Sequence, residues 1–290
     1  MTVTQSHAKQ PVELKGLQSH FVMNDANTIP RLGLGVYMSE AGKEAEDAVV
    51  WALQAGYRHI DTATNYGNEA SVGEAIRRSG VPREEVFVTT KLTEDDQGYD
   101  SAIAALNLSL EKMGLDYVDL YLIHSPLRGT GPRLASWKAF ETLVEQGKAK
   151  SIGVSNYGIH HLQELFDTNP KIRPSVNQIE VNPWLRREEI VAFCESQHIA
   201  VEAYCPLAKA KKLEDPVVNQ IANKYSKSPA QVLIRWSLQM GYVVIPKSVK
   251  KERIEHNADV YDFVLADEDM TLLNALNENF ICSWDPTIEP

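Results

Sequence analysis

The amino-acid sequence predicts a closed (β/α)8 barrel, an α/β fold known as the TIM barrel, with an N-terminal β-hairpin at the barrel bottom. Short apolar or β-branched runs recur eight times along the chain, and stretches with helical periodicity separate most of them. Strands that alternate with helices pair in parallel through right-handed crossovers, and eight such units in about 250 residues are typical of this barrel.

The predicted strands are the apolar runs Leu32–Val36, Arg58–Ile60, Val86–Thr89, Val118–Ile123, Ser151–Val154, Ser175–Ile179, Ala200–Tyr204 and Val243–Ile245. Two of the intervening helices carry a clear apolar face. One places Ala45, Ala48, Val49, Ala52 and Leu53 together and stops at Gly56, and the other aligns Ile103, Leu106, Leu110 and Met113 before Gly114. Both glycines suit the C-terminal end of a helix.

The segment FVMNDANTIP, before the first barrel strand, predicts a hairpin that turns at Asp25–Asn27 and covers the barrel bottom. We expect residues 1–16 to form a polar tail and residues 17–290 a single domain, because no low-complexity linker or repeat divides them. A doubly wound open sheet is the alternative fold. It is disfavoured because Gly129-x-Gly131 continues to Leu134, so no GxGxxG motif opens a helix after a strand.

Composition restricts the possible functions. The chain has 290 residues, 43% apolar and 23% charged, and a formal net charge of -10, which disfavours nonspecific binding to nucleic acid or anionic membranes. Its three cysteines, Cys194, Cys205 and Cys282, lack CxxC spacing, so we expect neither a disulfide framework nor a metal site. No secretory signal and no apolar run of about 18 residues is visible, and we expect a cytoplasmic protein.

Reactive groups of such barrels lie at the carboxyl ends of the strands. The residues at those ends are mostly of types that packing alone does not explain: Asp61, Lys91, His124, Ser155, Asn156, Gln178, Glu180, Tyr204, Lys247 and Ser248. The segment HIDTATNYGNE adds Tyr66, five residues after Asp61 and at the start of a loop. This end of the barrel is therefore the predicted active site.

Four of these residues form a candidate set for proton transfer to an oxygen atom. A nearby ammonium group favours the phenolate, so Lys91 is expected to lower the pKa of Tyr66. Asp61 would keep the buried Lys91 charged, and His124 would donate a hydrogen bond to a polarised carbonyl oxygen. Such a set gives or takes a proton while another species transfers a hydride.

The hydride donor is indicated by residues 245–257. Lys247, Lys250, Lys251 and Arg253 lie at the predicted start of the helix after the last strand, a recurrent phosphate site in barrels. Arg253 would hold a phosphate bidentately, with Lys247 as a point charge. A nicotinamide ring would stack on Tyr204, and its carboxamide would bond to Ser155, Asn156 and Gln178.

Taken together, the sequence resembles the aldo-keto reductases from about Phe21 to Trp284. The motifs that carry the resemblance are DTATNYGNE at 61–69, TTKL at 89–92, DLYLIHSP at 119–126, GVSNY at 153–157, NQIEVNP at 177–183 and IPKSVKKERIEHN at 245–257. The resemblance implies an NADPH-dependent carbonyl reductase without a metal, in which Tyr66 protonates the carbonyl oxygen. The short segment LRGTGPRLAS after His124 is similar to the loop of the microbial diketogluconate-reductase-like subgroup.

The same resemblance implies contacts for the whole nucleotide. Lys247, Ser248 and Arg253 would meet the 2′-phosphate, Asn257 the adenine, and Leu207 would complete the cofactor site beside Tyr204. The expected substrate pocket consists of Tyr37, Thr93, Ser125 and Trp284, and the expected ligand is a small carbonyl compound. The protein is expected to be a monomer or a weak dimer. Tyr37, Thr93 and Ser125 replace tryptophans frequent in relatives, and His256 replaces a frequent glutamate. Trp184 and Phe280–Trp284 are the alternative aromatic walls.

Three alternatives stay open in the sequence. Gly153-Val-Ser155-Asn-Tyr157 is superficially similar to the nucleophile elbow of a serine hydrolase, but the final glycine is missing. A nucleotide-binding regulatory subunit with residual reductase activity is the main functional alternative. Lys209, Lys211 and Lys212 form either a flap over the cofactor pyrophosphate or a solvated loop, and the loop is favoured.

Overall fold

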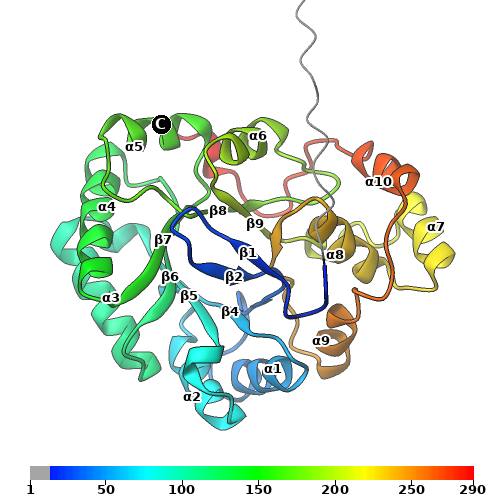
Figure 1. Ribbon diagram of the computed structural model, residues 1–290, viewed down its shortest axis with the longest axis horizontal. Coiled ribbons are helices and arrows are strands. Elements are labelled where there is room, and N and C mark those ends of the chain that lie inside the picture. Colours follow the sequence, from blue (N-terminus) through cyan, green and yellow to red (C-terminus); the bar gives the residue numbers. More distant parts are fainter. Residues whose placement is uncertain (1–13) are drawn as a thin grey trace, which may run out of the picture.

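The computed structural model describes residues 14–290, which form a barrel of parallel strands surrounded by helices (Figure 1). Eight strands follow one another round the sheet in chain order: β3 (Leu34–Gly35), β4 (His59–Asp61), β5 (Phe87–Leu92), β6 (Val118–Ile123), β7 (Ala149–Ser155), β8 (Val176–Glu180), β9 (Ala200–Tyr204) and β10 (Val243–Val244). Parallel bridges between Leu32 and Val244 and between Gly35 and Lys247 join the last strand to the first. The predicted (β/α)8 fold is confirmed.

Ten α-helices occur among the described residues. They are α1 (Lys43–Gln54), α2 (Glu69–Ser79), α3 (Tyr99–Met113), α4 (Thr130–Glu145), α5 (Ile159–Asp167), α6 (Glu188–Ser196), α7 (Pro216–Tyr225), α8 (Pro229–Gln239), α9 (Lys251–Ala258) and α10 (Asp267–Asn274). The predicted apolar face of α1 is buried, and the helix ends two residues before Gly56, whose φ of 97° turns the chain toward β4. Helix α3 ends against Gly114, which caps it in the left-handed conformation as predicted.

Several strands run further toward their carboxyl ends than the apolar runs indicate. β5 continues from Thr89 to Leu92 and so includes Lys91, while β7 reaches Ser155 and β8 reaches Glu180. Polar residues normally interrupt a buried strand, and this is why the predicted strands stop early. Here the polar side chains are buried together, so the ladder continues into the active site.

The N-terminal hairpin consists of β1 (His20–Val22) and β2 (Thr28–Pro30), paired antiparallel. Its apolar residues Met23 and Ile29 join a buried cluster with side chains from the barrel strands. Asn24 donates to the carbonyl of Pro174 at 2.9 Å, just before β8 begins. The hairpin therefore closes the barrel bottom, as predicted, and of the expected tail 1–16 residues 1–13 lie outside the described part of the chain.

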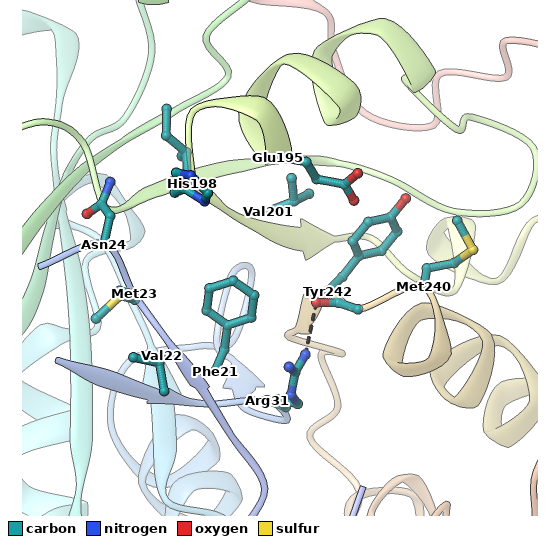
Figure 2. Close-up of a pocket in the computed structure, with 12 residues that line it drawn as sticks. Phe21, Val22, Met23, Asn24, Arg31, Glu195, His198, Val201, Met240 and Tyr242 are labelled. Carbon is teal, nitrogen blue, oxygen red and sulfur yellow. Dashed lines mark hydrogen bonds between the residues drawn. The ribbon is translucent and has the colours of Figure 1, made fainter. Parts of the chain in front are cut away.

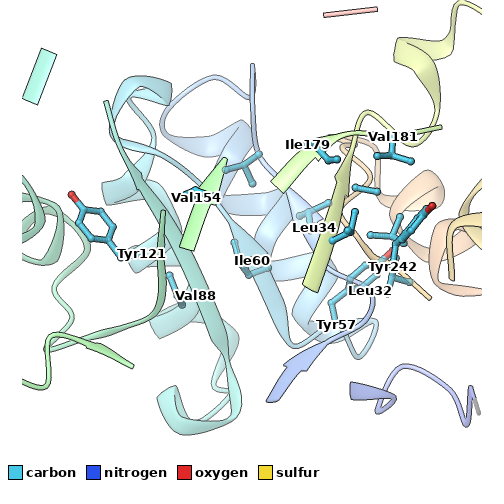
Figure 3. Close-up of a cluster of buried hydrophobic side chains, with 14 of the residues drawn as sticks. Leu32, Leu34, Tyr57, Ile60, Val88, Tyr121, Val154, Ile179, Val181 and Tyr242 are labelled. Carbon is cyan, nitrogen blue, oxygen red and sulfur yellow. The ribbon is translucent and has the colours of Figure 1, made fainter. Parts of the chain in front are cut away.

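The main hydrophobic core lies between the strands and the surrounding helices (Figure 3). Leu34, Ile60, Val88 and Val154 come from β3, β4, β5 and β7 and pack in one cluster with helix residues such as Leu53. Strands buried on both faces need such continuous apolar sequences. This packing fixes the positions of the strand ends and hence of the polar residues that follow them.

A cavity of about 510 Å³ lies on the hairpin side of the barrel (Figure 2). Its walls include Phe21 and Met23 of the hairpin region, Val201 near the start of β9, and Arg31, which donates to the Gly241 carbonyl at 2.9 Å. None of the residues predicted for the active site lines it. Among the helices of the described chain, none is both long and apolar enough for a membrane crossing.

Candidate active site

The predicted acid, lysine and tyrosine meet at the carboxyl ends of β4 and β5. Lys91 Nζ lies 2.6 Å from Asp61 Oδ1 and 3.2 Å from Tyr66 Oη, and it also donates to the carbonyl of Thr62 at 3.0 Å. The Lys91 side chain has no exposed surface. A buried ammonium group is tolerated when its charge is paired and its protons are donated, and these three acceptors meet that requirement.

Tyr66 is positioned by a short 3-10 turn, Thr64–Tyr66, directly after β4. Thr64 Oγ1 donates to the carbonyl of Lys91 at 2.9 Å and so holds the turn against β5, and Gly67 ends the turn with a φ of 70°. The Tyr66 ring is flanked by Tyr37 at 5.0 Å and by His124 at 5.6 Å, both measured between ring centroids. The structure thus brings the four predicted catalytic residues together.

The protonation state of Tyr66 differs from the sequence-based expectation. Burial raises the pKa of Tyr66 well above its usual range, and the negative charge of Asp61 adds to the increase. Lys91 was expected to lower this pKa, but the net change is an increase, because the desolvation of the phenolate dominates. A phenol that keeps its proton at neutral pH is suited to act as a proton donor.

His124 follows β6 and is neutral in this environment. Burial lowers the pKa of His124 to about 3, and the charge of Lys91 acts in the same direction. Its Nδ1 is buried and has no hydrogen-bond partner among the described residues. A neutral imidazole carries one N–H and can donate it to a substrate oxygen without adding a second cation beside Lys91.

The predicted nicotinamide residues form one hydrogen-bonded network at the ends of β7, β8 and β9. Ser155 Oγ donates to the carbonyl of Gln178 at 2.9 Å, and Asn156 Nδ2 donates to the carbonyl of His124 at 2.9 Å. Tyr204, half-buried, donates its hydroxyl to Asn156 Oδ1 at 2.8 Å. The network therefore connects Tyr204, the ring expected to stack on the nicotinamide, to His124 of the predicted catalytic group, Asp61, Tyr66, Lys91 and His124.

Gln178 also reaches into the barrel. Its Nε2 donates to Asp61 Oδ2 at 2.8 Å and to Glu202 Oε2 at 3.0 Å. Glu202, on β9, is fully buried and was not among the predicted site residues. The signal that identifies it is a lone acidic residue inside an otherwise apolar predicted strand, AVEAY.

The predicted phosphate residues surround the start of α9. Lys247 and Arg253 are exposed, and within residues 14–290 neither makes an ion pair. Ser248 and Asn257 are buried at the base of this region, and Leu207 is half-buried in the turn after β9. Helix α9 begins without a side-chain cap, and its positive end lies close in sequence to the two exposed cations Lys247 and Arg253.

The expected substrate residues separate into two groups. Tyr37 and Trp284 are exposed at 47% and 38%, and Thr93 is half-buried. Ser125 is fully buried, and its Oγ donates to Glu94 Oε1 at 2.5 Å. Trp184 is buried as well and donates from Nε1 to Asp215 Oδ2 at 3.2 Å. The structure therefore does not support a direct substrate contact for Ser125 or Trp184.

Two further observations complete the site. Lys209 donates to Ser283 Oγ at 3.2 Å and Lys212 pairs with Glu278 at 2.5 Å, so this lysine-rich loop contacts the C-terminal segment. In the described part of the chain, no cluster of three or more His, Cys, Asp or Glu side chains has the geometry to hold a metal ion.

Comparison with known proteins places this geometry in a family. The model of the Aldo/keto reductase family matches residues 31–278, most of the chain. The chain belongs to the aldo-keto reductase family. Asp61, Tyr66, Lys91 and His124 lie within the matched range, at the strand ends described above.

Relatives of known name support this assignment and are reductases. The chain is 48% identical over 267 residues to the 9,11-endoperoxide prostaglandin H2 reductase of Trypanosoma cruzi, which covers 91% of this chain and 93% of that protein. It is 48% identical over 251 residues to the glyoxal reductase of Bacillus subtilis, with 87% and 90% covered. This aldo-keto reductase is accordingly an oxidoreductase.

Solved structures agree with the fold. An aldo-keto reductase from a Medee basin deep-sea metagenome library has a TM-score of 0.88 and 44% identity, with 92% of this chain and 97% of that chain covered. The aldo-keto reductase of Bombyx mori in complex with NADP has a TM-score of 0.85 and 41% identity, with 91% and 94% covered.

Proposed function

We propose that this protein reduces the carbonyl group of a small aldehyde, ketone or ketoester to an alcohol, with NADPH as the reductant and Tyr66 as the general acid. The observation that carries the proposal is the contact of Lys91 Nζ with both Asp61 Oδ1, at 2.6 Å, and Tyr66 Oη, at 3.2 Å. Hydrophobic packing does not explain a buried lysine in contact with both an acid and a phenol. This arrangement stabilises negative charge that develops on a phenol oxygen when the phenol loses its proton.

The roles of the protein groups follow from their charges. Tyr66 is protonated at neutral pH and donates its proton to the carbonyl oxygen as negative charge develops there. Lys91 stabilises the phenolate that forms, and Asp61 keeps Lys91 charged and correctly directed. Neutral His124 donates a hydrogen bond to the same carbonyl oxygen and so orients the substrate.

The residues at the barrel mouth fit a nicotinamide nucleotide. NADPH supplies a hydride to the carbonyl carbon when it is bound. Lys247 and Arg253 are cations without ion-pair partners among the described residues, which suits the 2′-phosphate, and the buried Ser248 and Asn257 lie beside them. In this proposal Tyr204 and Leu207 would contact the nicotinamide ring, while Ser155, Asn156 and Gln178 would hold its carboxamide.

The substrate is proposed at the level of a chemical class. Tyr37, Thr93 and Trp284 would form a partly polar pocket that suits small oxygenated carbonyl compounds, and the short loop after His124 supports a place in the diketogluconate-reductase-like subgroup. The name of the Bacillus subtilis relative makes glyoxal a rational first compound to test. We further propose a cytoplasmic monomer or weak dimer.

The decisive experiment follows NADPH absorbance during incubation with glyoxal, simple aldehydes, ketones and ketoesters. We expect oxidation of NADPH by the wild-type protein and a loss of roughly 10²–10⁴-fold in turnover for Tyr66→Phe, which keeps the ring but has no proton to donate. Nucleotide binding, followed by fluorescence, should be retained. Unchanged turnover in Tyr66→Phe would reject its role as acid, and tight binding without any wild-type turnover would favour the regulatory-subunit alternative.

A further inference from the structure

A second carboxyl group lies behind the catalytic group in the barrel interior. Glu202 on β9 has no exposed surface, and Gln178 connects it to Asp61 because one amide nitrogen donates to Oε2 of Glu202 at 3.0 Å and to Oδ2 of Asp61 at 2.8 Å. Lys91 Nζ holds the other oxygen of Asp61 at 2.6 Å. A continuous chain of contacts therefore leads from Tyr66 through Lys91, Asp61 and Gln178 to Glu202.

The surroundings of Glu202 supply no counterion of its own. Oε1 of Glu202 lacks a hydrogen-bond partner among the described residues, and its nearest cationic candidate is His59 Nε2 on β4, at 3.5 Å. Burial lowers the pKa of His59 to about 3, so this ring is neutral, and its Nε2 lies 3.1 Å from Thr89 Oγ1 on β5. Lys91 is the one ammonium group within this chain of contacts, and Asp61 is already paired with it.

One ammonium group thus serves two buried carboxyl groups. Two carboxylates close together in a dry interior repel each other, so one of them keeps its proton. Asp61 has the direct ion pair and is the charged member. Burial raises the pKa of Glu202 to about 8, and the charge of Asp61 adds to the increase. Glu202 is therefore a neutral acid at neutral pH.

We infer that Glu202 is a positioning residue for the proposed reduction: it accepts a hydrogen bond from Gln178 at 3.0 Å, and through Gln178 it holds Asp61 in line with Lys91 and Tyr66. The inference rests on the proposed function. Ionised Glu202 would place a second negative charge behind Asp61, and the charge of Glu202 is one of the causes that raise the pKa of Tyr66. A phenol with a still higher pKa is a weaker acid, so ionisation of Glu202 slows proton donation.

The test is the pH profile of kcat for the wild-type protein and for Glu202→Gln. Glutamine keeps the size and a carbonyl oxygen that accepts from Gln178, but it stays neutral at every pH. We expect wild-type kcat to fall as the pH rises through about 8. In Glu202→Gln the fall should move upward, so that the ratio of variant to wild-type kcat rises roughly tenfold or more between pH 7 and pH 9.5.

A matched control separates this role from a merely structural one. Glu141 on α4 is also buried, and it accepts from the backbone N–H of Ile172 at 3.0 Å, away from the strand ends. Glu141→Gln should follow the wild-type pH profile even if it loses stability. An equal ratio of Glu202→Gln to wild-type kcat at every pH would overturn the inference.

A measurement on the wild-type protein covers the case in which Glu202→Gln does not fold. Infrared difference spectra between pH 7 and pH 9.5 should show the carbonyl band of a protonated carboxylic acid that disappears at the higher pH. If this band is absent while turnover is normal, the inference about Glu202 is rejected and the proposed function is not affected. Failure of the wild-type protein to reduce any carbonyl compound would reject the proposed function and, with it, the positioning role.

Discussion

The hydroxyl of Tyr204 donates to Oδ1 of Asn156 at 2.8 Å and so joins the end of β9 to the turn after β7. Asn156 has a φ of 61°, a left-handed conformation that asparagine tolerates better than most residues. In this conformation its amide nitrogen reaches the carbonyl of His124, at 2.9 Å. One asparagine side chain therefore holds the Tyr204 hydroxyl and the backbone of His124 in a fixed relation.

This relation predicts different effects for two substitutions of Tyr204. Tyr204→Phe keeps the stacking surface and loses one hydrogen bond, worth about 1 kcal/mol, so NADPH affinity should fall about fivefold or less. Tyr204→Ala also removes the aromatic face and should weaken binding by a further tenfold or more. Fluorescence titration with NADPH measures both. Equal affinities for wild type and Tyr204→Ala would show that the ring does not carry the nicotinamide.

The sequence was sufficient to predict the order of the strands and the position of the four candidate catalytic residues at the barrel mouth, because both depend on local patterns. Apolar runs identify strands, and the position of Asp61 or Lys91 just past such a run places it at the carboxyl end of the barrel. The predicted strands corresponding to β5 and β8 ended too early, because Lys91 and Glu180 look like interruptions of a strand until their buried partners are known.

The features that sequence reasoning missed arise from contacts between strands distant in the chain. Gln178 bonds Asp61, 117 residues away, and Glu202, 24 residues away, and no local pattern reports this pairing. The direction of the Tyr66 pKa was wrong for the same reason, since it depends on how completely the folded barrel removes water from the ring. Ser125 was expected near the substrate, but its bond to Glu94 keeps it buried.

The free cations at α9 predict how the protein discriminates between nucleotides. NADPH carries a 2′-phosphate that NADH lacks, so Lys247→Ala or Arg253→Ala should weaken NADPH by roughly 1–3 kcal/mol and leave NADH nearly unchanged. The dissociation constants of each variant for NADPH and for NADH test this prediction. Lys171, whose side chain is 76% exposed and pairs with Glu145 on α4, provides the control. Lys171→Ala should change neither dissociation constant. Equal losses for both nucleotides would exclude a 2′-phosphate site.

The contact between α2 and the end of α3 predicts a large difference between two glycine substitutions. A Cβ on Gly73 would lie 1.9 Å from the carbonyl oxygen of Met113, whereas a Cβ on Gly131, in α4, would meet nothing within 4 Å. Gly73→Ala must push the two helices apart and should destabilise the fold by several kcal/mol, roughly 3 or more. Gly131→Ala should be neutral or stabilise by up to about 1 kcal/mol, since alanine favours a helix. Urea unfolding of both variants tests this, and similar stabilities would contradict the close contact.

Neutral His124 predicts how stability depends on pH. The pKa of His124 is lowered to about 3 in the folded protein, against 6.5 for the free side chain, mainly because the ring is buried. Between these values the unfolded chain binds a proton that the folded protein does not bind, so acidification through this range favours unfolding. For this single group the loss at pH 5.5 is about 1.4 kcal/mol relative to neutral pH.

The contribution of His124 is isolated by a variant, because Glu202 acts in the opposite sense. The raised pKa of Glu202 means that stability is lost as the pH rises toward about 8, so the two groups partly offset each other in the wild-type protein. On going from pH 7.5 to pH 5.5, the free energy of unfolding of His124→Gln should change in favour of the folded protein by about 1.4 kcal/mol relative to wild type. His198→Gln, at an exposed position, should behave like wild type in urea titrations at both pH values. If wild type and His124→Gln lose the same free energy, His124 accepts a proton in the folded protein, and its assignment as a neutral hydrogen-bond donor is wrong.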